Sequence, residues 1–280
     1  MAVHVVTDSS CDLPETLARS LDIAIVPCNI HFGQESYRDG VDMRPDEFYR
    51  RLAGDVLPKT SQPSVEAFLE TYRHFEEPGA QVLSLHLSSK LSTTVKAAQL
   101  AKEQMGSQVI RVLDSSQVSL GLGILAMEAA RISREGGSLN DAAAFVEKER
   151  ANIASYFSVD TLEFLVKGGR ASKVQGFLGS LLNIKPVLVV KDDGEVHPFE
   201  RHRNRKRVME RLVELVAHAK GLRALGVLHS VSPEDAEALA EACGAHIPRD
   251  KIVVSQFSSV LGTHVGPRAL GLVLWTAPQS

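Results

Sequence analysis

Short apolar runs alternate with longer amphipathic runs through the first half of the chain. Apolar runs of roughly four to eight residues predict strands, and apolar residues that recur every three or four positions predict helices. Helices between strands act as crossover connections, so the pattern predicts a mainly parallel sheet. The predicted strands are residues 3–6, 23–30, 82–87 and 109–113, and the predicted helices are residues 45–53, 63–75, 92–105, 121–134 and 138–151.

Two local signals refine this half of the chain. Asp12, with Glu15 three positions later, predicts a helix start capped by Asp12. Gly33 and Gln34 stand between two extended segments and predict a small hairpin.

The second half predicts another α/β unit, an α/β sandwich. Asp192-Asp193-Gly194 is a strong hairpin signal between two strands. We place the domain boundary near residue 153, which gives domains at residues 1–153 and 154–280. The predicted strands are residues 155–160, 186–190, 195–203, 224–228, 252–256 and 270–275, and the predicted helices are residues 161–167, 204–220 and 233–243.

Composition narrows the class of protein. The 280 residues are 44% hydrophobic and 23% charged, which is typical of a globular protein. A net charge of −3 excludes a globally basic nucleic-acid binder. No apolar run is long enough to span a membrane, and we expect no secretory signal. The three cysteines form no C-x-x-C pair, so we expect a reduced, cytoplasmic protein.

Hydroxyl-rich segments are the first candidates for binding chemistry. Residues 60–64 read Thr-Ser-Gln-Pro-Ser, and Pro63 suits the first turn of a helix. Residues 88–94 follow a predicted strand, with Ser92 as the expected N-cap. Helix N-termini attract anions, so these segments and the loop at residues 7–10 are candidates for one shared anion site. Plain helix capping is the alternative interpretation of each segment.

Three further segments carry weaker signals. His264 lies between glycines in residues 262–267 and is a candidate donor to a carboxylate or phosphate, or else a surface histidine in a turn. Residues 121–126 match G-x-G-x-x-A, but a helix follows where a strand is needed, which favours close helix packing. The basic run at residues 201–207 indicates an acidic partner, nucleic acid or a solvated helix start.

The motifs of several enzyme classes are missing from the sequence. It contains no P-loop, no G-x-S-x-G and no H-E-x-x-H. Its ten histidines lack close metal-ligand spacing. We therefore expect no metal and none of the usual chemistry of nucleotide hydrolases, serine hydrolases or metalloenzymes.

Six segments, in the same order along the chain, resemble the DegV family. The match as a whole runs from residue 3 to about residue 275. The six segments read TDSSCDLP, KTSQPS, SSKLS, DTLEFLVKGGR, IKP and GTHVGP, and they begin at Thr7, Lys59, Ser88, Asp160, Ile184 and Gly262. The resemblance implies a fatty-acid-binding protein of bacterial type, with its ligand between two α/β domains. It further implies a binding subunit without catalytic residues or cofactor of its own. A separate kinase subunit would use ATP to phosphorylate the bound carboxylate, giving an acyl phosphate for phospholipid synthesis.

The same resemblance assigns the polar site residues. It places Thr60, Ser92 and His264 on the carboxylate, with Ser61, Thr93 and Thr94 as further candidates for the carboxylate site. Thr93 stands where the family usually has glycine. Its side chain would narrow the carboxylate end of the site or change how closely the backbone approaches the ligand. Arg268 stands where the family often has glycine, adding a charge near the site or pointing outward. Arg170 and Arg203 resemble arginines near the portal, where the kinase would dock.

The acyl tail of a fatty acid would need an apolar tunnel, and the second domain supplies candidate residues to line it. A gross contribution of roughly 11 kcal/mol from about fourteen buried methylenes would make the tail dominate affinity. Ordinary core packing is the alternative role of these residues. The candidates are Phe177, Leu178, Leu181, Leu182, Ile184 and Val187.

Two other functions stay open from the sequence. One is a stand-alone enzyme for a small phosphorylated or carboxylated substrate. The other is a regulatory or nucleic-acid module that uses residues 201–207. The resemblance favours a long-chain fatty acid and a kinase subunit as partners, with neither nucleic acid nor stable membrane insertion.

Overall fold

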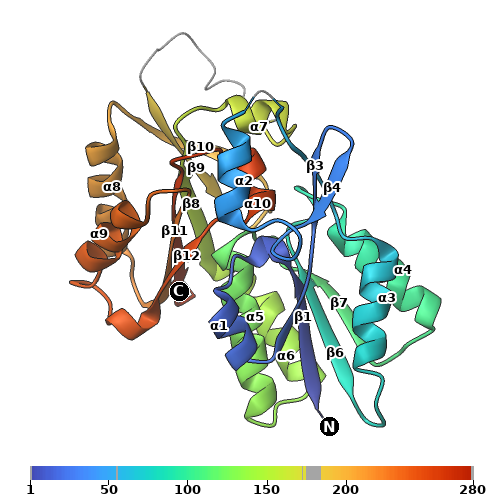
Figure 1. The fold of residues 1–280 in the computed structure, drawn as a ribbon. Coiled ribbons are helices and arrows are strands. Elements are labelled where there is room, and N and C mark those ends of the chain that lie inside the picture. Colours follow the sequence, from blue (N-terminus) through green and yellow to red (C-terminus); the bar gives the residue numbers. More distant parts are fainter. Residues whose placement is uncertain (1, 55, 172, 175–183, 279–280) are drawn as a thin grey trace.

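A computed structural model describes residues 2–54, 56–171, 173–174 and 184–278 of the chain (Figure 1). Its first sheet has the strand order β2-β1-β6-β7, and all neighbouring strands are parallel. The chain runs from β1 to β2 on one side and returns through β6 on the other, so β1 and β6 flank a topological switch point. The strands are β1 (Val3–Asp8), β2 (Ile23–Val26), β6 (Gln81–His86) and β7 (Ile110–Asp114).

Helices cover both faces of this sheet, as the side-chain alternation along β1 requires. Val6 packs with α3 and α4 on one face, whereas Val3 and Val5 pack toward α5 on the other. These helices are α1 (Glu15–Ser20), α3 (Val65–His74), α4 (Thr94–Met105), α5 (Leu120–Arg134) and α6 (Leu139–Glu149).

A small antiparallel sheet stands beside the first one. Its strand order is β4-β3-β5, with β3 (Asn29–Phe32), β4 (Glu35–Arg38) and β5 (Lys59–Ser61). The hairpin predicted at Gly33 is confirmed, since β3 pairs with β4 across it and Gly33 has φ of 60°. The single segment predicted at residues 23–30 is wrong, because β2 and β3 belong to different sheets. Helix α2 (Pro45–Leu52) follows β4.

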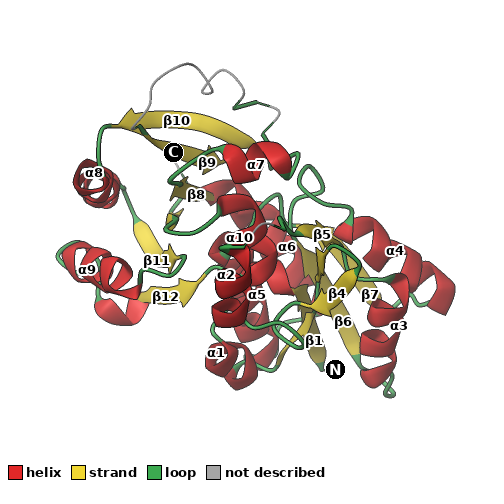
Figure 2. Ribbon diagram, turned by 45° about the horizontal axis from the view of Figure 1, so that its top comes forward, coloured by secondary structure: helices red, strands yellow, loops and turns green. Residues whose placement is uncertain are grey.

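The second sheet has six strands in the order β10-β9-β8-β13-β11-β12. It is mostly antiparallel, with β11 and β12 as its parallel pair. Figure 2 shows α8 and α9 on its outer side, where Val187 and Val227 are buried. Its elements are β8 (Ile153–Ser158), β9 (Lys185–Val190), β10 (Val196–His202), α8 (Arg205–His218), β11 (Leu222–His229), α9 (Pro233–Cys243), β12 (Ile252–Gln256) and β13 (Leu270–Thr276).

Helix α5 packs against both sheets. Leu120 approaches Gly226 of β11, and the inner face of the second sheet, including Phe157 and Val273, shares one core with α5 and β1. Gly121 and Gly123 allow close contact with Ser155 and with the Cys11 carbonyl, which confirms the packing interpretation of residues 121–126. The α/β class is thus confirmed, while the division at residue 153 stays a prediction.

Several predicted helix ends are wrong. Helix α1 begins at Glu15 after Pro14, and Asp12 lies outside it in the left-handed region with φ of 51°. Ser64 caps α3, which leaves Pro63 outside the helix and Thr60 in a strand. Thr93, not Ser92, is the N-cap residue of α4.

The alternative interpretation of His264 as a surface histidine in a turn is wrong, because residues Ser259–Val265 form helix α10. A second short helix, α7 (Glu163–Lys167), packs against it. Short 3-10 helices span Ser9–Cys11, Arg150–Asn152 and Arg249–Lys251. Among the described residues, no helix is both long and apolar enough to cross a membrane.

Candidate functional site

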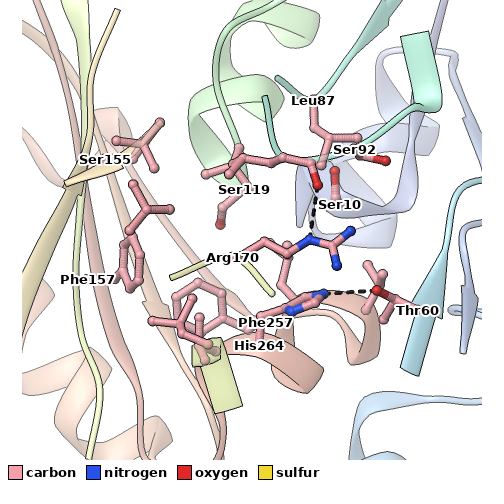
Figure 3. Close-up of a pocket in the computed structure, with 18 of the residues that line it drawn as sticks. Ser10, Thr60, Leu87, Ser92, Ser119, Ser155, Phe157, Arg170, Phe257 and His264 are labelled. Carbon is pink, nitrogen blue, oxygen red and sulfur yellow. Dashed lines mark hydrogen bonds between the residues drawn. The ribbon is translucent and has the colours of Figure 1, made fainter. Parts of the chain in front are cut away.

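A pocket of about 400 Å³ lies where the first sheet, α10 and the second sheet meet (Figure 3). Ser10 and Leu87, which follow β1 and β6, place the pocket at the switch point of the parallel sheet. Its volume is within the range of roughly 300–1,000 Å³ that is typical of small-molecule sites. The sequence located this edge through its hydroxyl-rich loops, but only the fold brings α10 to it.

Most of the polar residues predicted to bind a carboxylate lie on the wall of this pocket. The structure brings together five of the six residues predicted to hold the carboxylate. The sixth, Thr94, is buried and is not among the described residues that line the pocket, although its hydroxyl lies 2.8 Å from Ser92 Oγ. The five that line it are Thr60, Ser61, Ser92, Thr93 and His264.

His264 is held in a defined orientation by Thr60. Its Nε2 lies 2.9 Å from Thr60 Oγ1, and Figure 3 shows this bond beside Arg170. Burial, and secondarily the charge of Arg170, lowers the pKa of His264 to about 3. The ring is therefore neutral at pH 7. Its Nδ1 is buried without a hydrogen-bond partner in the described part of the chain and faces Gly168, where a Cβ atom would collide with it.

Arg170 brings a positive charge to this polar end. Its Nε donates to the Leu91 carbonyl at 3.2 Å and its Nη1 to the Gly168 carbonyl at 2.6 Å. Burial lowers its pKa from the ordinary value. Among the described residues Arg170 forms no ion pair with a carboxylate, and Glu195, which also lines the pocket, pairs with Lys173. The pocket therefore contains a half-buried cation that an anionic ligand would neutralise.

The apolar wall of the pocket comes from the inner face of the second sheet. Sequence reasoning missed these residues, because alternation along a strand does not say which of two buried faces borders a cavity. They include Phe157, Val190, Leu228 and Val273, together with Phe257 after β12.

None of the residues predicted to form the acyl pocket is among the described residues that line this pocket. Phe177, Leu178, Leu181 and Leu182 lie outside the described residues. Ile184 is half-buried and is not among the described lining residues. Val187 faces α8 on the opposite side of the second sheet, so the structure does not place it in this pocket.

A buried carboxylate, Asp8, fixes the loops that line the pocket. Asp8 accepts hydrogen bonds from Ser10 and Leu87 and lies 3.0 Å from His86 Nδ1, joining the ends of β1 and β6. Sequence reasoning placed Asp8 in a loop that was a candidate for an anion site and assigned no role to its carboxylate, although an acidic residue at a strand end was a usable signal.

Two other buried carboxylates hold the start of α10. Asp12 accepts from the Ser258 N–H at 2.9 Å, and Asp39 accepts from the Ser259 N–H at 3.1 Å. Burial is the main cause that raises the pKa of Asp12 to about 7 and that of Asp39 to about 6. These carboxylates fix the helix that carries His264.

The cysteines near the pocket are unreactive in character. Cys28 lines the pocket and Cys11 lies in the core beneath it. Burial raises the pKa of both thiols well above the ordinary value. Both are therefore protonated at neutral pH and poor nucleophiles.

One cluster has the residue types of a metal site. Ligand atoms of Asp193, Glu195 and His197 lie within 4.8 Å of one another. Lys173 pairs with both carboxylates, which neutralises charge that a cation would need. The cluster is therefore an ion-pair network at the β9–β10 hairpin.

Arg203 lies apart from the polar end of the pocket. It is exposed between β10 and α8 and does not line the described pocket. Within the same basic run, Arg205 pairs with Asp235 and Arg207 with Glu210, while Asn204 caps α8. This pairing favours the solvated helix start among the earlier interpretations.

Comparison with known proteins gives a consistent result. The family model described as "Uncharacterised protein, DegV family" matches residues 2–277. A DegV family protein from Thermus thermophilus, described for fatty acid binding, is 35% identical, with a TM-score of 0.90 over 99% of this chain and 100% of that one. DegV from Bacillus subtilis, described as a fatty acid binding protein, is 32% identical, with a TM-score of 0.88 and the same coverage. A stearic acid-binding protein from Eubacterium ventriosum is 27% identical, with a TM-score of 0.88 over 98% of each chain.

Proposed function

The chain belongs to the DegV family, and from that premise we propose that it binds one long-chain fatty acid and presents the carboxylate to a separate kinase subunit. The partner would phosphorylate the carboxylate to an acyl phosphate for phospholipid synthesis. One observation carries the proposal: an apolar pocket ends in a polar group whose cation, Arg170, has no carboxylate partner among the described residues. The fatty acid binding of similar solved proteins supports it.

The polar end is suited to a carboxylate because it supplies donors. An ionised carboxylate only accepts hydrogen bonds. With a proton on Nε2, neutral His264 donates to Thr60 Oγ1, and the Thr60 hydroxyl hydrogen is then free for the ligand. Arg170 supplies the positive charge, and Ser92 lies in the same wall. A bond to a charged group contributes about 1.5–3 kcal/mol.

The acyl tail supplies most of the affinity and the polar end sets its direction. Each buried methylene contributes about 0.8 kcal/mol. Association and ordering offset about 4–15 kcal/mol of the gross gain. The apolar lining residues, such as Phe157 and Val273, would cover the tail.

The chain acts in this proposal as a carrier and not as a catalyst by itself. Nucleotide and metal come from the kinase subunit, since the sequence lacks a P-loop. Arg203, which is exposed, and Arg170, at the polar end, are the proposed contacts for that partner. Such a carrier works in the cytoplasm, where its partner has ATP.

Native mass spectrometry of the purified protein, followed by organic extraction, tests the ligand. We expect a one-to-one adduct with the mass of a fatty acid. An empty protein that also takes up no added fatty acid contradicts the proposal, and a bound polar metabolite would favour the small-anion alternative.

Reconstitution with the kinase subunit tests presentation. His264→Ala and Ser92→Ala are expected to slow acyl-phosphate formation more than they weaken tail binding, because they remove groups at the polar end only. Normal phosphorylation rates in both variants would contradict the carboxylate assignment.

A further inference from the structure

Ser10 and Ser119 are two serines on the wall of the pocket that are not assigned to the carboxylate. Both are buried, at 1% and 4% exposure, and both line the pocket. The Ser119 N–H donates to the Ser10 carbonyl at 2.9 Å, so the two loops are adjacent. In Figure 3 Ser10 lies beside Ser92 at the polar end, and Ser119 lies toward Ser155 of the second sheet.

The hydroxyl hydrogen of Ser10 is already used. Ser10 Oγ donates to Asp8 Oδ1 at 2.5 Å. The other Asp8 oxygen accepts from the Leu87 N–H at 3.2 Å and contacts His86 Nδ1, so donors surround this carboxylate. A serine hydroxyl has one hydrogen and two acceptor lone pairs. Ser10 can therefore offer the pocket only an acceptor.

The hydroxyl hydrogen of Ser119 is also already used, and the backbone conformation of this residue is unusual. Its Oγ donates to Asp12 Oδ2 at 2.6 Å. It precedes α5, where serine ordinarily caps the helix, but its oxygen accepts no bond from the first turn among the described residues. Its φ of 57° and ψ of −145° are strained for a residue other than glycine. Strain of this kind persists where the surrounding structure enforces it, often at ligand sites.

A plain hydrocarbon chain forms no hydrogen bond with the acceptors that Ser10 and Ser119 offer. A chain that carries a hydroxyl group would donate to one of them, which gains a hydrogen bond inside a water-poor pocket. We propose that Ser10 and Ser119 form a hydroxyl-accepting subsite, and that the ligands of this pocket include long-chain fatty acids hydroxylated along the chain. The proposal rests on the proposed function and names a ligand class for the same pocket.

Binding of matched acids tests the subsite. Delipidated protein is titrated at pH 8, where Asp12, with a pKa of about 7, is mostly ionised and Ser119 must donate to it. The probes are stearic acid and a series of hydroxystearic acids that differ in the position of the hydroxyl. We expect at least one isomer to bind roughly three- to tenfold more tightly than stearic acid, the ratio that one neutral hydrogen bond gives.

Variants connect that ratio to the two serines. Ser10→Ala or Ser119→Ala, whichever removes the acceptor of the preferred isomer, is expected to bring the ratio of that isomer to stearic acid down to about one. Ser133→Ala is the matched control, because this serine also donates its hydroxyl, to the Val3 carbonyl, but at the far end of α5. It should keep the wild-type ratio. Circular dichroism and the stearic acid affinity of each variant report on folding.

The outcomes separate the two proposals. If stearic acid binds but no isomer binds more tightly, the subsite is overturned and the fatty-acid carrier remains. A preference that survives unchanged in both serine variants overturns it as well. If stearic acid itself does not bind, the proposed function fails, and the subsite fails with it.

Discussion

Thr60 Oγ1 lies 2.9 Å from His264 Nε2, a hydrogen bond between residues 204 positions apart. It connects β5 of the small antiparallel sheet with α10, which precedes the last strand of the second sheet. The polar end of the pocket therefore exists only when these two distant parts of the chain are packed together.

The Thr60 hydroxyl is expected to control binding of the carboxylate. Thr60→Val removes the hydroxyl but keeps the shape, which leaves His264 Nε2 without its partner. We expect fatty-acid affinity to fall about tenfold, equivalent to about 1.4 kcal/mol, and affinity for the methyl ester to change little. Calorimetric titration measures both. Thr60→Ser should restore most of the loss, and equal affinities of wild type and Thr60→Val would contradict this role.

Arg170 is expected to provide the charge that holds the ligand. Arg170→Met removes the cation, and fatty-acid affinity should fall at least about tenfold because a charge-assisted bond is lost. Affinity for the corresponding primary alcohol should change much less. Lys167→Met is the control, since Lys167 is exposed on α7 and pairs with Glu163. A parallel loss for acid and alcohol would mean that Arg170 shapes the pocket without recognising charge.

Gly168 is expected to be required for the position of His264. Its backbone is ordinary, with φ of −75°, but an added Cβ would meet the His264 ring, including Cε1 at 2.9 Å. Gly168→Ala should therefore push His264 away from Thr60 and weaken fatty-acid binding about tenfold or more, as a titration would measure.

A glycine outside the pocket lining provides a matched control. Gly136, which follows α5, has φ of 90° and no heavy atom within 4 Å of an added Cβ. Gly136→Ala should lower the stability by about 1 kcal/mol through backbone strain and leave fatty-acid affinity near wild type. If both variants bind equally well, the contact with His264 has no role in binding.

Asp12 and Asp39 are expected to make stability fall as pH rises. Burial raises their pKa values to about 7 and about 6, while the unfolded chain has the ordinary value near 4. At a pH between the unfolded and the native pKa of each carboxyl group, that group is protonated in the native state and ionised in the unfolded state. The contribution of each group to the free energy of unfolding should therefore decrease by about 1.4 kcal/mol per pH unit within its window.

Asparagine variants isolate this effect. His264 acts in the opposite direction, because its lowered pKa removes stability as pH falls from about 6.5 toward about 3. The difference in unfolding free energy between wild type and Asp12→Asn, from urea denaturation at pH 5 and pH 8, cancels that contribution. We expect wild type to lose stability relative to the variant at pH 8. A constant difference would mean that Asp12 stays ionised in the native state across this range.

Arg203 is expected to affect presentation without affecting binding. It is exposed and lies outside the described pocket lining, so Arg203→Glu should leave fatty-acid affinity unchanged. Acyl-phosphate formation by the kinase subunit should fall several-fold, because the charge at the proposed contact is reversed. Arg134→Glu, at the exposed end of α5, is the control for charge reversal elsewhere. Unchanged phosphorylation in Arg203→Glu would remove this residue from the docking surface.

The local sequence determined the elements of the fold. Short apolar runs predicted the parallel strands, and apolar residues every three or four positions predicted the crossover helices, because both patterns follow from which local surfaces are buried. The Asp192–Gly194 hairpin was likewise readable from a short segment. The helix starts at Asp12 and Pro63 were misjudged, because a residue with capping chemistry can use it elsewhere, as Asp12 does with Ser119 and Ser258.

The ordered motifs identified Thr60, Ser61, Ser92, Thr93 and His264, and the fold brings these five to one pocket. Only the tertiary structure decided how they act. The neutrality of His264, the lack of a carboxylate beside Arg170 within the described chain, and the acceptor character of Ser10 all depend on burial and on partners distant in sequence. The apolar wall was equally invisible, because both faces of the second sheet are buried and their strands read alike. Sequence determines which faces avoid water, whereas the packing of α5 and α10 between the sheets decides which face borders a cavity.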